Sequence, residues 1–294
     1  MTSIERYFSP RTLEEAAGIL SRGGVTILAG GTDLMPQSHA GRVKFEPVLM
    51  NIRRVGELGG IALAGGMIRI GALATITDLL THPIVRERLP VLTEAADHFA
   101  SDQIRNVGTL GGSLCNASPA GDLAPPLLVL DAMVELASKP NGSMKVRSMP
   151  MREFFVGPGR TQRAQNEILT AVHVPMPKPG FAARFYKFGI RPALDIATIA
   201  IAIGGVMVQG RAGRALKDVR VVFGAVAPTP IRAPKTEAVL EGTPLDAAAI
   251  DAAANAARDE VQPISDIRAS AWYRKELIHN MTRRTLQDVA ASGN

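Results

Sequence analysis

The hydrophobic and polar positions follow two periods along the chain, which predicts a mixture of helices and strands. Apolar residues recur at helical spacing after the segment TLEE at residues 12–15, a capping-box pattern, so a helix is expected to begin there. Residues 25–29 form a short apolar run with β-branched members, which is typical of a strand. Residues 61–71 predict two strands joined by a turn at Gly65-Gly66.

The rest of the chain continues this mixture. Short helices are expected at residues 77–80 and 91–100, and Pro125-Pro126 favour a helix start within residues 123–137. The remaining expected elements are strands or a helix–strand pair at residues 195–208 and 219–226, an alanine-rich helix after residues 243–246, and a last helix from about residue 270 to residue 290 with Trp272, Leu277, Met281 and Leu286 as its apolar members. The pattern as a whole predicts an α+β fold.

A proline-rich segment divides the chain. Residues 174–180 contain three prolines in five positions, which makes a stiff connector. We therefore place a domain boundary there, with one domain at residues 1–176 and a smaller one at residues 177–294.

Composition narrows the protein class. With 46% hydrophobic and 20% charged residues, the 294-residue chain has the balance of a globular protein. Its longest apolar run, residues 196–208, is shorter than the roughly 20 residues of a membrane span. The single cysteine, Cys115, makes no internal disulfide and cannot alone hold a zinc or iron–sulfur site. Together with an N-terminus that lacks a secretory pattern, this predicts a cytoplasmic location.

The formal net charge of +6 is compatible with a nucleic acid, an anionic ligand or an acidic partner. The aromatic content is only 4%, which leaves few stacking platforms for bases. A solvated or docking face is therefore favoured over nucleic-acid binding. The one basic group near the C-terminus consists of Arg268, Arg274, Lys275, Arg283 and Arg284.

Several common catalytic patterns are absent from the sequence. There is no phosphate-binding Gly-x-x-x-x-Gly-Lys loop, no His-Glu-x-x-His metal motif and no Gly-x-Ser-x-Gly nucleophile motif. Residues 157–159 lack the third glycine of a dinucleotide fingerprint. We therefore assign no catalytic residue and no metal ligand.

Two diglycines remain as candidate ligand-binding segments. They are Gly30-Gly31, beside Thr32, and Gly111-Gly112, beside Thr109. Glycine lets the main chain approach a ligand and direct successive N–H groups at one anion, and hydroxyls suit phosphate oxygens. Two such stretches that converge would hold a pyrophosphate. The alternative is that each is only a tight turn.

A carboxylate follows the second diglycine among small residues. Asp122 suits acceptance of hydrogen bonds from the hydroxyls of a sugar alcohol. Alternatively, it caps the helix expected after it. The spacing alone favours neither.

Residues 29–36 and 109–125 resemble the two flavin signatures of the molybdenum hydroxylase family, specifically of its FAD-binding medium subunit. The carbon monoxide and xanthine dehydrogenases of bacteria contain such a subunit. The second signature is long and specific, whereas the first is shorter. The resemblance continues through residues 152–159, 166–170, 185–187 and 193–197, and so covers nearly the whole chain.

The resemblance implies a two-subdomain FAD-binding domain of the vanillyl-alcohol oxidase (PCMH) type, followed by a smaller α+β C-terminal domain. The subdomains would span about residues 1–56 and 57–176, and FAD would lie between them.

The resemblance also implies the cofactor-binding residues. Thr109, Gly111 and Gly112 would close one side of the pyrophosphate, and Asn116 lies in the same signature. Asp122 would bind the ribityl chain. The residues that would wrap the pyrophosphate are Ile27, Leu28, Ala29, Gly30, Gly31, Thr32, Asp33 and Leu34. Those near the adenine or the flavin ring are Leu169, Lys187, Phe99, Ala100 and Ile196, the last at a place where some members put a tyrosine over the ring.

The implied function is electron transfer. FAD on this chain would receive electrons from a [2Fe–2S] small subunit and pass them to an external acceptor, while a molybdopterin cofactor on a large subunit oxidises the substrate. The expected assembly is a dimer of heterotrimers, a heterohexamer, with no nucleic acid and no membrane span. One alternative is a self-sufficient FAD-dependent oxidase or dehydrogenase, which needs its own base. Another is a basic nucleic-acid-binding protein. The substrate and the terminal acceptor stay open.

Overall fold

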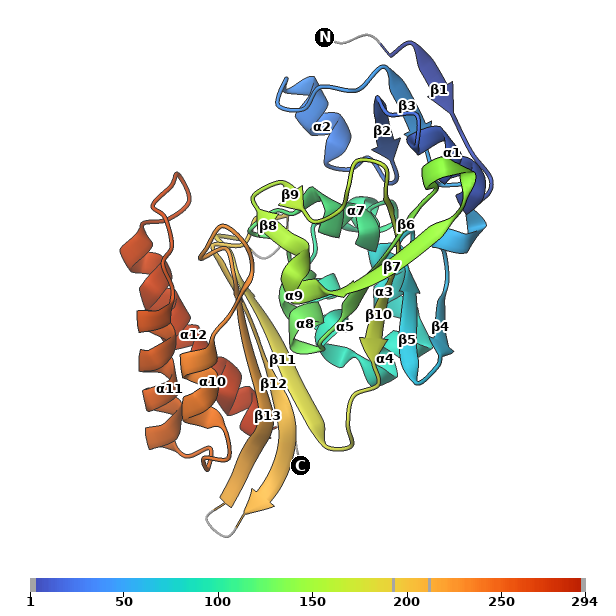
Figure 1. Cartoon of the computed structure of the whole chain (residues 1–294). Helices are drawn as coiled ribbons and strands as arrows, with labels where there is room; N and C mark the ends of the chain where they lie inside the picture. The colour runs from blue at the N-terminus through green and yellow to red at the C-terminus, as the bar shows by residue number, and fades with distance from the viewer. Residues whose placement is uncertain (1–3, 192–193, 211–212, 292–294) are drawn as a thin grey trace.

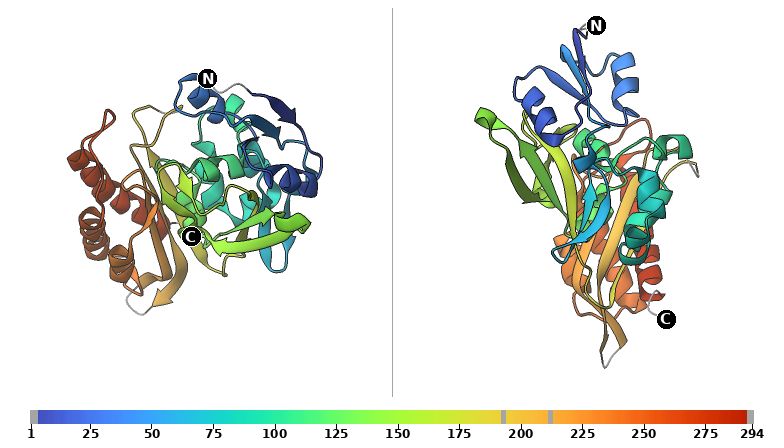
Figure 2. Two further views of the ribbon diagram at one scale, coloured as in Figure 1. Left: turned by 45° about the horizontal axis from the view of Figure 1, so that its top comes forward. Right: turned by 90° about the vertical axis from the view of Figure 1, so that its right-hand side faces the viewer.

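The computed structural model describes residues 4–191, 194–210 and 213–291 (Figure 1). Three main sheets follow one another along the chain, each with its own helices. Figure 2 shows the corresponding regions arranged along one long axis, with the N-terminal region at one end.

The N-terminal region is a small parallel sheet with helical crossovers. Its strand order is β1 (Arg6–Phe8), β3 (Val48–Asn51), β2 (Val25–Leu28). Helix α1 (Leu13–Leu20) connects β1 to β2, and α2 (Leu34–His39) connects β2 to β3. The expected cap is present, because the Thr12 side chain accepts a hydrogen bond from the N–H of Glu15. The Glu15 carboxylate accepts from the N–H of Arg11 rather than that of Thr12, so the box is displaced by one residue.

The middle region is an antiparallel five-stranded sheet whose inner face is covered by helices. Its strand order is β4 (Ile61–Ala64), β5 (Met67–Gly71), β10 (Ile168–Pro175), β6 (Met133–Ser138), β7 (Lys145–Pro150). Alternate strand residues such as Ile68 and Ile70 point to the helices and are fully buried. The helices and short elements of this region are η1 (Gly56–Leu58), α3 (Ile76–Thr81), α4 (Pro83–Arg88), α5 (Pro90–Asp97), α6 (Asp102–Arg105), α7 (Leu110–Asn116), α8 (Ala124–Val129), η2 (Pro140–Gly142), α9 (Met151–Phe154), β8 (Phe155–Gly157) and β9 (Arg160–Thr161).

The C-terminal region is an antiparallel sheet buried on both faces. Its strands are β11 (Phe181–Phe188), β12 (Ile199–Gly210), β13 (Gly213–Gly224) and β14 (Ile231–Arg232), and its helices are α10 (Pro234–Leu240), α11 (Ala247–Glu260) and α12 (Ala271–Ala291). Ile201 and Ile203 pack against the helices, whereas Ala200 and Ala202 pack against the middle region. This double burial explains the apolar run at residues 196–208, since a strand covered on both faces shows no alternation.

The α+β prediction is confirmed, with three corrections. The second diglycine is not in a loop, because α7 begins at Leu110 and includes both glycines. Residues 123–137 divide into α8 and β6, and α4 was not expected. Trp272 lies on α12 but is 70% exposed rather than part of the apolar face. The sheet changes between Pro175 and Phe181, although the domain boundary itself stays a prediction.

Within the described ranges, 4–191, 194–210 and 213–291, no helix is both long and apolar enough to span a bilayer.

Candidate functional site

The first glycine loop leaves the end of β2 and leads into α2. Among the residues that the structure describes, the backbone N–H groups of Gly30, Gly31, Thr32 and Asp33 have no hydrogen-bond acceptor. Gly31 has a φ of +71°, in the left-handed region that glycine adopts without strain. Successive N–H groups in such a turn form an anion-binding concavity. This loop therefore has the donors that a phosphate group requires.

The second diglycine is built differently, because its N–H groups already have protein acceptors. The N–H of Gly111 donates to the carbonyl oxygen of Ala72 at 2.8 Å, and the N–H of Gly112 donates to Thr109 Oγ1 at 3.1 Å. A Cβ on Gly111 would lie 2.8 Å from the Cβ of Ala72. Glycine at position 111 thus allows α7 to pack closely against the end of β5.

The first glycine loop contacts the main chain just before the second diglycine, across the boundary between the N-terminal and middle regions. A Cβ on Gly30 would lie 2.1 Å from the carbonyl oxygen of Val107 and 3.1 Å from the Cα of Gly108. A Cβ on Gly108 would lie 3.4 Å from Thr32 Oγ1. Only glycine at position 30 permits this approach. The first loop therefore lies against the main chain that leads into α7, and we call residues 30–33 and 107–112 together the glycine surface.

Asp122 forms a buried ion pair that leaves one carboxylate oxygen unsatisfied. Its Oδ2 accepts from Lys187 Nζ at 2.8 Å, and Lys187 also donates to the carbonyl oxygen of His98 at 3.0 Å. Oδ1 is buried without a hydrogen-bond partner. Burial raises the pKa of Asp122 to about 6, the Lys187 ammonium opposes this, and the negative charge of Asp195 adds to it.

A buried carboxylate oxygen with no donor costs free energy, so it marks a place for a ligand hydroxyl. The alternative that Asp122 caps the next helix is wrong. The N-cap of α8 is Leu123, and no side chain caps that helix. Helix α7 joins this carboxylate to the glycine surface, since Thr109 begins it and Asp122 follows its last residue after a short turn.

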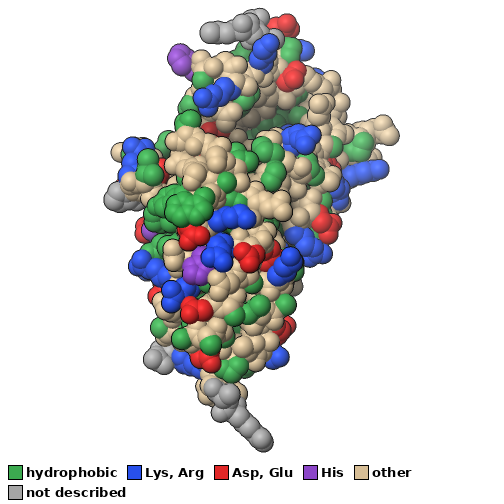
Figure 3. All heavy atoms as spheres, turned by 90° about the vertical axis from the view of Figure 1, so that its left-hand side faces the viewer, with side chains coloured by type: hydrophobic (Ala, Val, Ile, Leu, Met, Phe, Trp, Pro, Cys, Tyr) green, Lys and Arg blue, Asp and Glu red, His purple; other side chains and the backbone are tan. Residues whose placement is uncertain are grey.

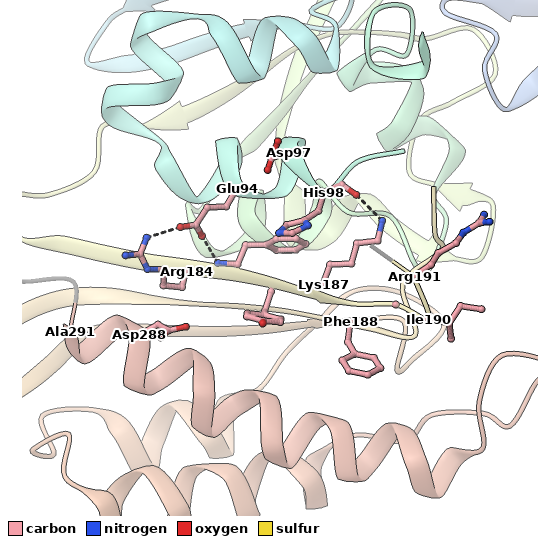
Figure 4. A pocket seen from close by; sticks show the side chains of 13 residues that line it. Glu94, Asp97, His98, Arg184, Lys187, Phe188, Ile190, Arg191, Asp288 and Ala291 are labelled. Carbon is pink, nitrogen blue, oxygen red and sulfur yellow. Dashed lines mark hydrogen bonds and ion pairs between the residues drawn. The ribbon is translucent and has the colours of Figure 1, made fainter. Parts of the chain in front are cut away.

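A groove of about 910 Å³ lies beside this ion pair (Figure 4). Strand β11 forms its floor, with α5 on one side and α12 on the other. Glu94 on α5 accepts from Arg184 Nη1 at 2.6 Å and from the N–H of Phe185 at 2.8 Å. Because Lys187 and His98 also line the groove, it gives access from solvent to the surroundings of Asp122.

The other residues of the candidate set lie in three places. Phe99 and Ala100 directly follow His98, so they lie near the Lys187 ammonium, and Ile196 is half exposed next to Asp195. Leu169 lies on β10 with its side chain buried in the core. Those around the glycine surface are Ile27, Leu28 and Ala29 at the end of β2, Leu34 at the start of α2 and Asn116 at the end of α7.

Sequence reasoning missed the main-chain partners of the site. His98 was not among the candidate site residues, yet its carbonyl oxygen accepts a hydrogen bond from Lys187. Val107 was not singled out, although its carbonyl oxygen contacts Gly30. Neither role depends on a side chain, so no residue-type pattern indicates it.

Comparisons with known proteins agree over the whole chain. The family profile described as "FAD binding domain in molybdopterin dehydrogenase" matches residues 2–177, and "CO dehydrogenase flavoprotein C-terminal domain" matches residues 184–289. The chain is 36% identical over 297 residues to a putative xanthine dehydrogenase FAD-binding subunit of Escherichia coli K12, covering 100% of this chain and 99% of the relative. It is 33% identical over 282 residues to the carbon monoxide dehydrogenase medium chain of Hydrogenophaga pseudoflava, covering 95% of each.

Solved structures give the same result. A carbon monoxide dehydrogenase from Hydrogenophaga pseudoflava that lacks the Mo-pyranopterin moiety matches with a TM-score of 0.90 at 32% identity, covering 99% of both chains. Quinoline 2-oxidoreductase from Pseudomonas putida 86 also matches with a TM-score of 0.90, at 29% identity over 99% of both chains. The prediction of an FAD-binding fold followed by a smaller C-terminal domain is thereby confirmed. The chain belongs to the family of FAD-binding subunits of molybdenum-containing dehydrogenases, and is an oxidoreductase subunit with FAD as its cofactor.

Proposed function

We propose that this chain is the electron-transfer subunit of a molybdenum-containing hydroxylase. It takes electrons from a [2Fe–2S] subunit and passes them through FAD to an external acceptor, while the substrate is oxidised on another subunit. The observation that carries this proposal is the loop of residues 30–33, whose N–H groups have no acceptor among the described residues and whose Gly30 lies against the main chain of Val107 and Gly108. This surface suits the diphosphate of a dinucleotide, which needs several N–H donors and close main-chain approach.

The remaining residues fit the other parts of the cofactor. We assign to the diphosphate side Ile27, Leu28, Ala29, Gly30, Gly31, Thr32, Asp33, Leu34, Thr109, Gly111, Gly112 and Asn116. Asp122 Oδ1 would accept a hydrogen bond from a ribityl hydroxyl, which removes the unsatisfied oxygen. Lys187, Phe99, Ala100 and Ile196 would border the flavin ring, and Leu169 would support the site from the core. FAD supplies the one- and two-electron chemistry when bound.

The surroundings of Asp122 favour electron transfer over direct substrate oxidation. A self-sufficient oxidase needs a base free to remove a proton. Here Asp122 is paired with Lys187, and Glu94 with Arg184. The chain also has one cysteine, whereas a [2Fe–2S] cluster takes four ligands, usually cysteines. The clusters are therefore assigned to a partner.

We also propose the partners: an iron–sulfur small subunit and a large subunit with the molybdopterin cofactor, arranged as a dimer of heterotrimers. The names of the relatives support this, since one is a medium chain and another an FAD-binding subunit. The basic balance of the chain, +6, fits an anionic cofactor and acidic partner surfaces.

Anaerobic reduction of the purified, FAD-loaded chain tests this function. We expect hypoxanthine, an aldehyde, carbon monoxide and quinoline to leave the visible flavin absorption unchanged, because the chain has no substrate-oxidising centre. A reduced [2Fe–2S] protein should bleach it. Bleaching by one of the substrates alone would support the self-sufficient oxidase instead, and a chain that retains no FAD would contradict both.

A further inference from the structure

Seven exposed apolar residues gather where two loops meet the start of α12, and we call them the apolar patch. They are Ile190, Leu194 and Ile196 in the loop after β11, Ile264 and Ile267 in the loop before α12, and Trp272 and Tyr273 in its first turn. Ile267 is 97% exposed and Ile190 77%. Figure 3, which views the molecule from the side of α11 and α12, shows hydrophobic side chains grouped on this face with basic side chains nearby. Exposed apolar groups of this kind mark interaction surfaces.

Specific contacts join the two loops into one surface. The rings of Phe188 and Tyr273 meet edge to face with centroids 6.4 Å apart. The buried Arg274 donates from Nη1 to the carbonyl oxygen of Thr198 at 2.8 Å, and from Nη2 to Asp266 Oδ1 at 2.8 Å. Asp266 in turn accepts from the N–H of Arg268 at 2.9 Å. The ends of the two loops are therefore held against the start of α12, which lowers the entropy cost of ordering this surface on binding.

The apolar patch adjoins the proposed flavin site through β11. Successive residues of a strand point to opposite faces, so Lys187 reaches Asp122 and His98 while Phe188 reaches Tyr273. Asp195, next to Ile196, lies near enough to Asp122 to raise its pKa. A partner bound on the patch would therefore sit beside the residues assigned to the flavin ring.

We propose that the apolar patch is the docking surface for an acidic [2Fe–2S] protein, the electron donor of this chain. This inference rests on the proposed function, because a protein that donates electrons to the flavin must bind beside it. Trp, Tyr and Arg are the residue types enriched at the centres of protein interfaces.

The charges around the patch favour an acidic occupant over a second copy of this chain. Arg191 and Arg268 are exposed in the two loops. The guanidinium of Arg268 pairs with Asp266 at 3.8 Å, whereas that of Arg191 donates to the carbonyl oxygen of Leu194 and has no ion pair among the described residues. The carboxylates of Asp195 and Asp266 accept hydrogen bonds within the loops. Two copies with a net charge of +6 each repel at long range, whereas an acidic partner is attracted.

The test isolates the native complex through a tag on this full-length chain. FAD, iron and acid-labile sulfide per chain are measured for the parent and for an Ile267→Asp, Trp272→Asp variant. Leu63→Asp with Val146→Asp is the control, since both residues are also exposed and apolar but lie on edge strands of the middle sheet. We expect the patch variant to keep its FAD and lose at least about tenfold of its co-purifying iron, as expected when central interface residues are removed. The control should keep both.

The other outcomes overturn this inference in distinguishable ways. Equal iron in parent and patch variant would place the donor elsewhere and leave the proposed function standing. Parent chain with FAD but no iron would show that no iron–sulfur protein docks here, and parent chain without FAD would contradict the proposed function itself. A parent homodimer that the patch substitutions dissociate would make a second copy the occupant. Parent binding to phosphatidylglycerol vesicles that the variant loses would make it a membrane surface.

Discussion

The two diglycines look alike in the sequence but do opposite things in the structure. Gly30-Gly31 follows a strand, and in the described part of the chain the four successive N–H groups of residues 30–33 have no acceptor. Gly111-Gly112 lies inside α7, and its N–H groups donate to Ala72 and Thr109. The first stretch thus offers hydrogen-bond donors to a ligand. The second offers close packing and a bare main-chain surface.

This difference shows what glycine at each position is required for. At position 30 the constraint is a contact between two regions of the chain, because an added Cβ would lie 2.1 Å from the carbonyl oxygen of Val107. At position 111 the constraint is local, between α7 and Ala72. Substitutions at the two sites should therefore separate ligand binding from packing.

Gly30→Ala is expected to have the largest effect. Its Cβ would meet main-chain atoms of Val107, which cannot move aside as a flexible side chain does. We expect FAD affinity to fall by about 100-fold or more, and the free energy of unfolding to fall by about 3 kcal/mol, the upper end of overpacking costs. Flavin fluorescence titration and urea unfolding measure the two quantities.

The control is Gly56→Ala, whose Cβ would meet nothing within 4 Å. It should change the free energy of unfolding by less than about 0.5 kcal/mol. A Gly30→Ala protein with the stability and FAD affinity of the parent would show that the close approach of Gly30 to Val107 is not required.

Gly111→Ala should act mainly on stability. Its Cβ would lie 2.8 Å from the Cβ of Ala72, so we expect a loss of about 2 kcal/mol in the free energy of unfolding. FAD affinity should fall less than in Gly30→Ala, because the Gly111 N–H is already used by Ala72. Adding Ala72→Gly should restore only part of the lost stability in a double-mutant cycle, because the added Cβ would still lie 2.9 Å from the carbonyl oxygen of residue 72. If stability is unchanged while FAD is lost, Gly111 contacts the ligand directly.

Local signals allowed much of the fold to be predicted. The turn at Gly65-Gly66 and the cap at Thr12 are each made by neighbouring residues, and both are found where expected. The run at residues 196–208 was ambiguous because β12 is buried on both faces, which depends on distant elements. Helix α4 follows α3 almost without a break, so its apolar spacing did not stand out.

The residue types of the site could be predicted from the sequence, but their hydrogen-bond partners could not. Asp122 was open to two uses because its neighbours suit both, and Lys187, 65 residues away, decides between them. Whether the amides of a diglycine are free depends on Ala72, which no local pattern includes.

The smallest expected effect concerns pH, and it separates Asp122 from the first glycine loop. Backbone N–H groups do not titrate near neutral pH, whereas the pKa of Asp122 is raised from 3.8 to about 6 by burial. In the FAD-free chain this group holds its proton more tightly when folded, so its contribution to the free energy of unfolding declines as pH rises from about 4 to about 6. A ligand hydroxyl that donates to Oδ1 favours the ionised form, so FAD affinity should change in the opposite direction. We expect it to weaken by about tenfold as pH falls from 7 to 5.

Asp122→Asn should remove this slope, whereas His98→Gln should keep it, since His98 binds Lys187 through its main-chain carbonyl. Measuring the FAD dissociation constants of the parent, Asp122→Asn and His98→Gln between pH 5 and pH 8 shows whether Asp122 causes the pH dependence. If the parent and Asp122→Asn share one slope, the unsatisfied oxygen of Asp122 does not meet the cofactor. Binding of the cofactor would then rest on the glycine surface, where the N–H groups of residues 30–33 have no acceptor among the described residues.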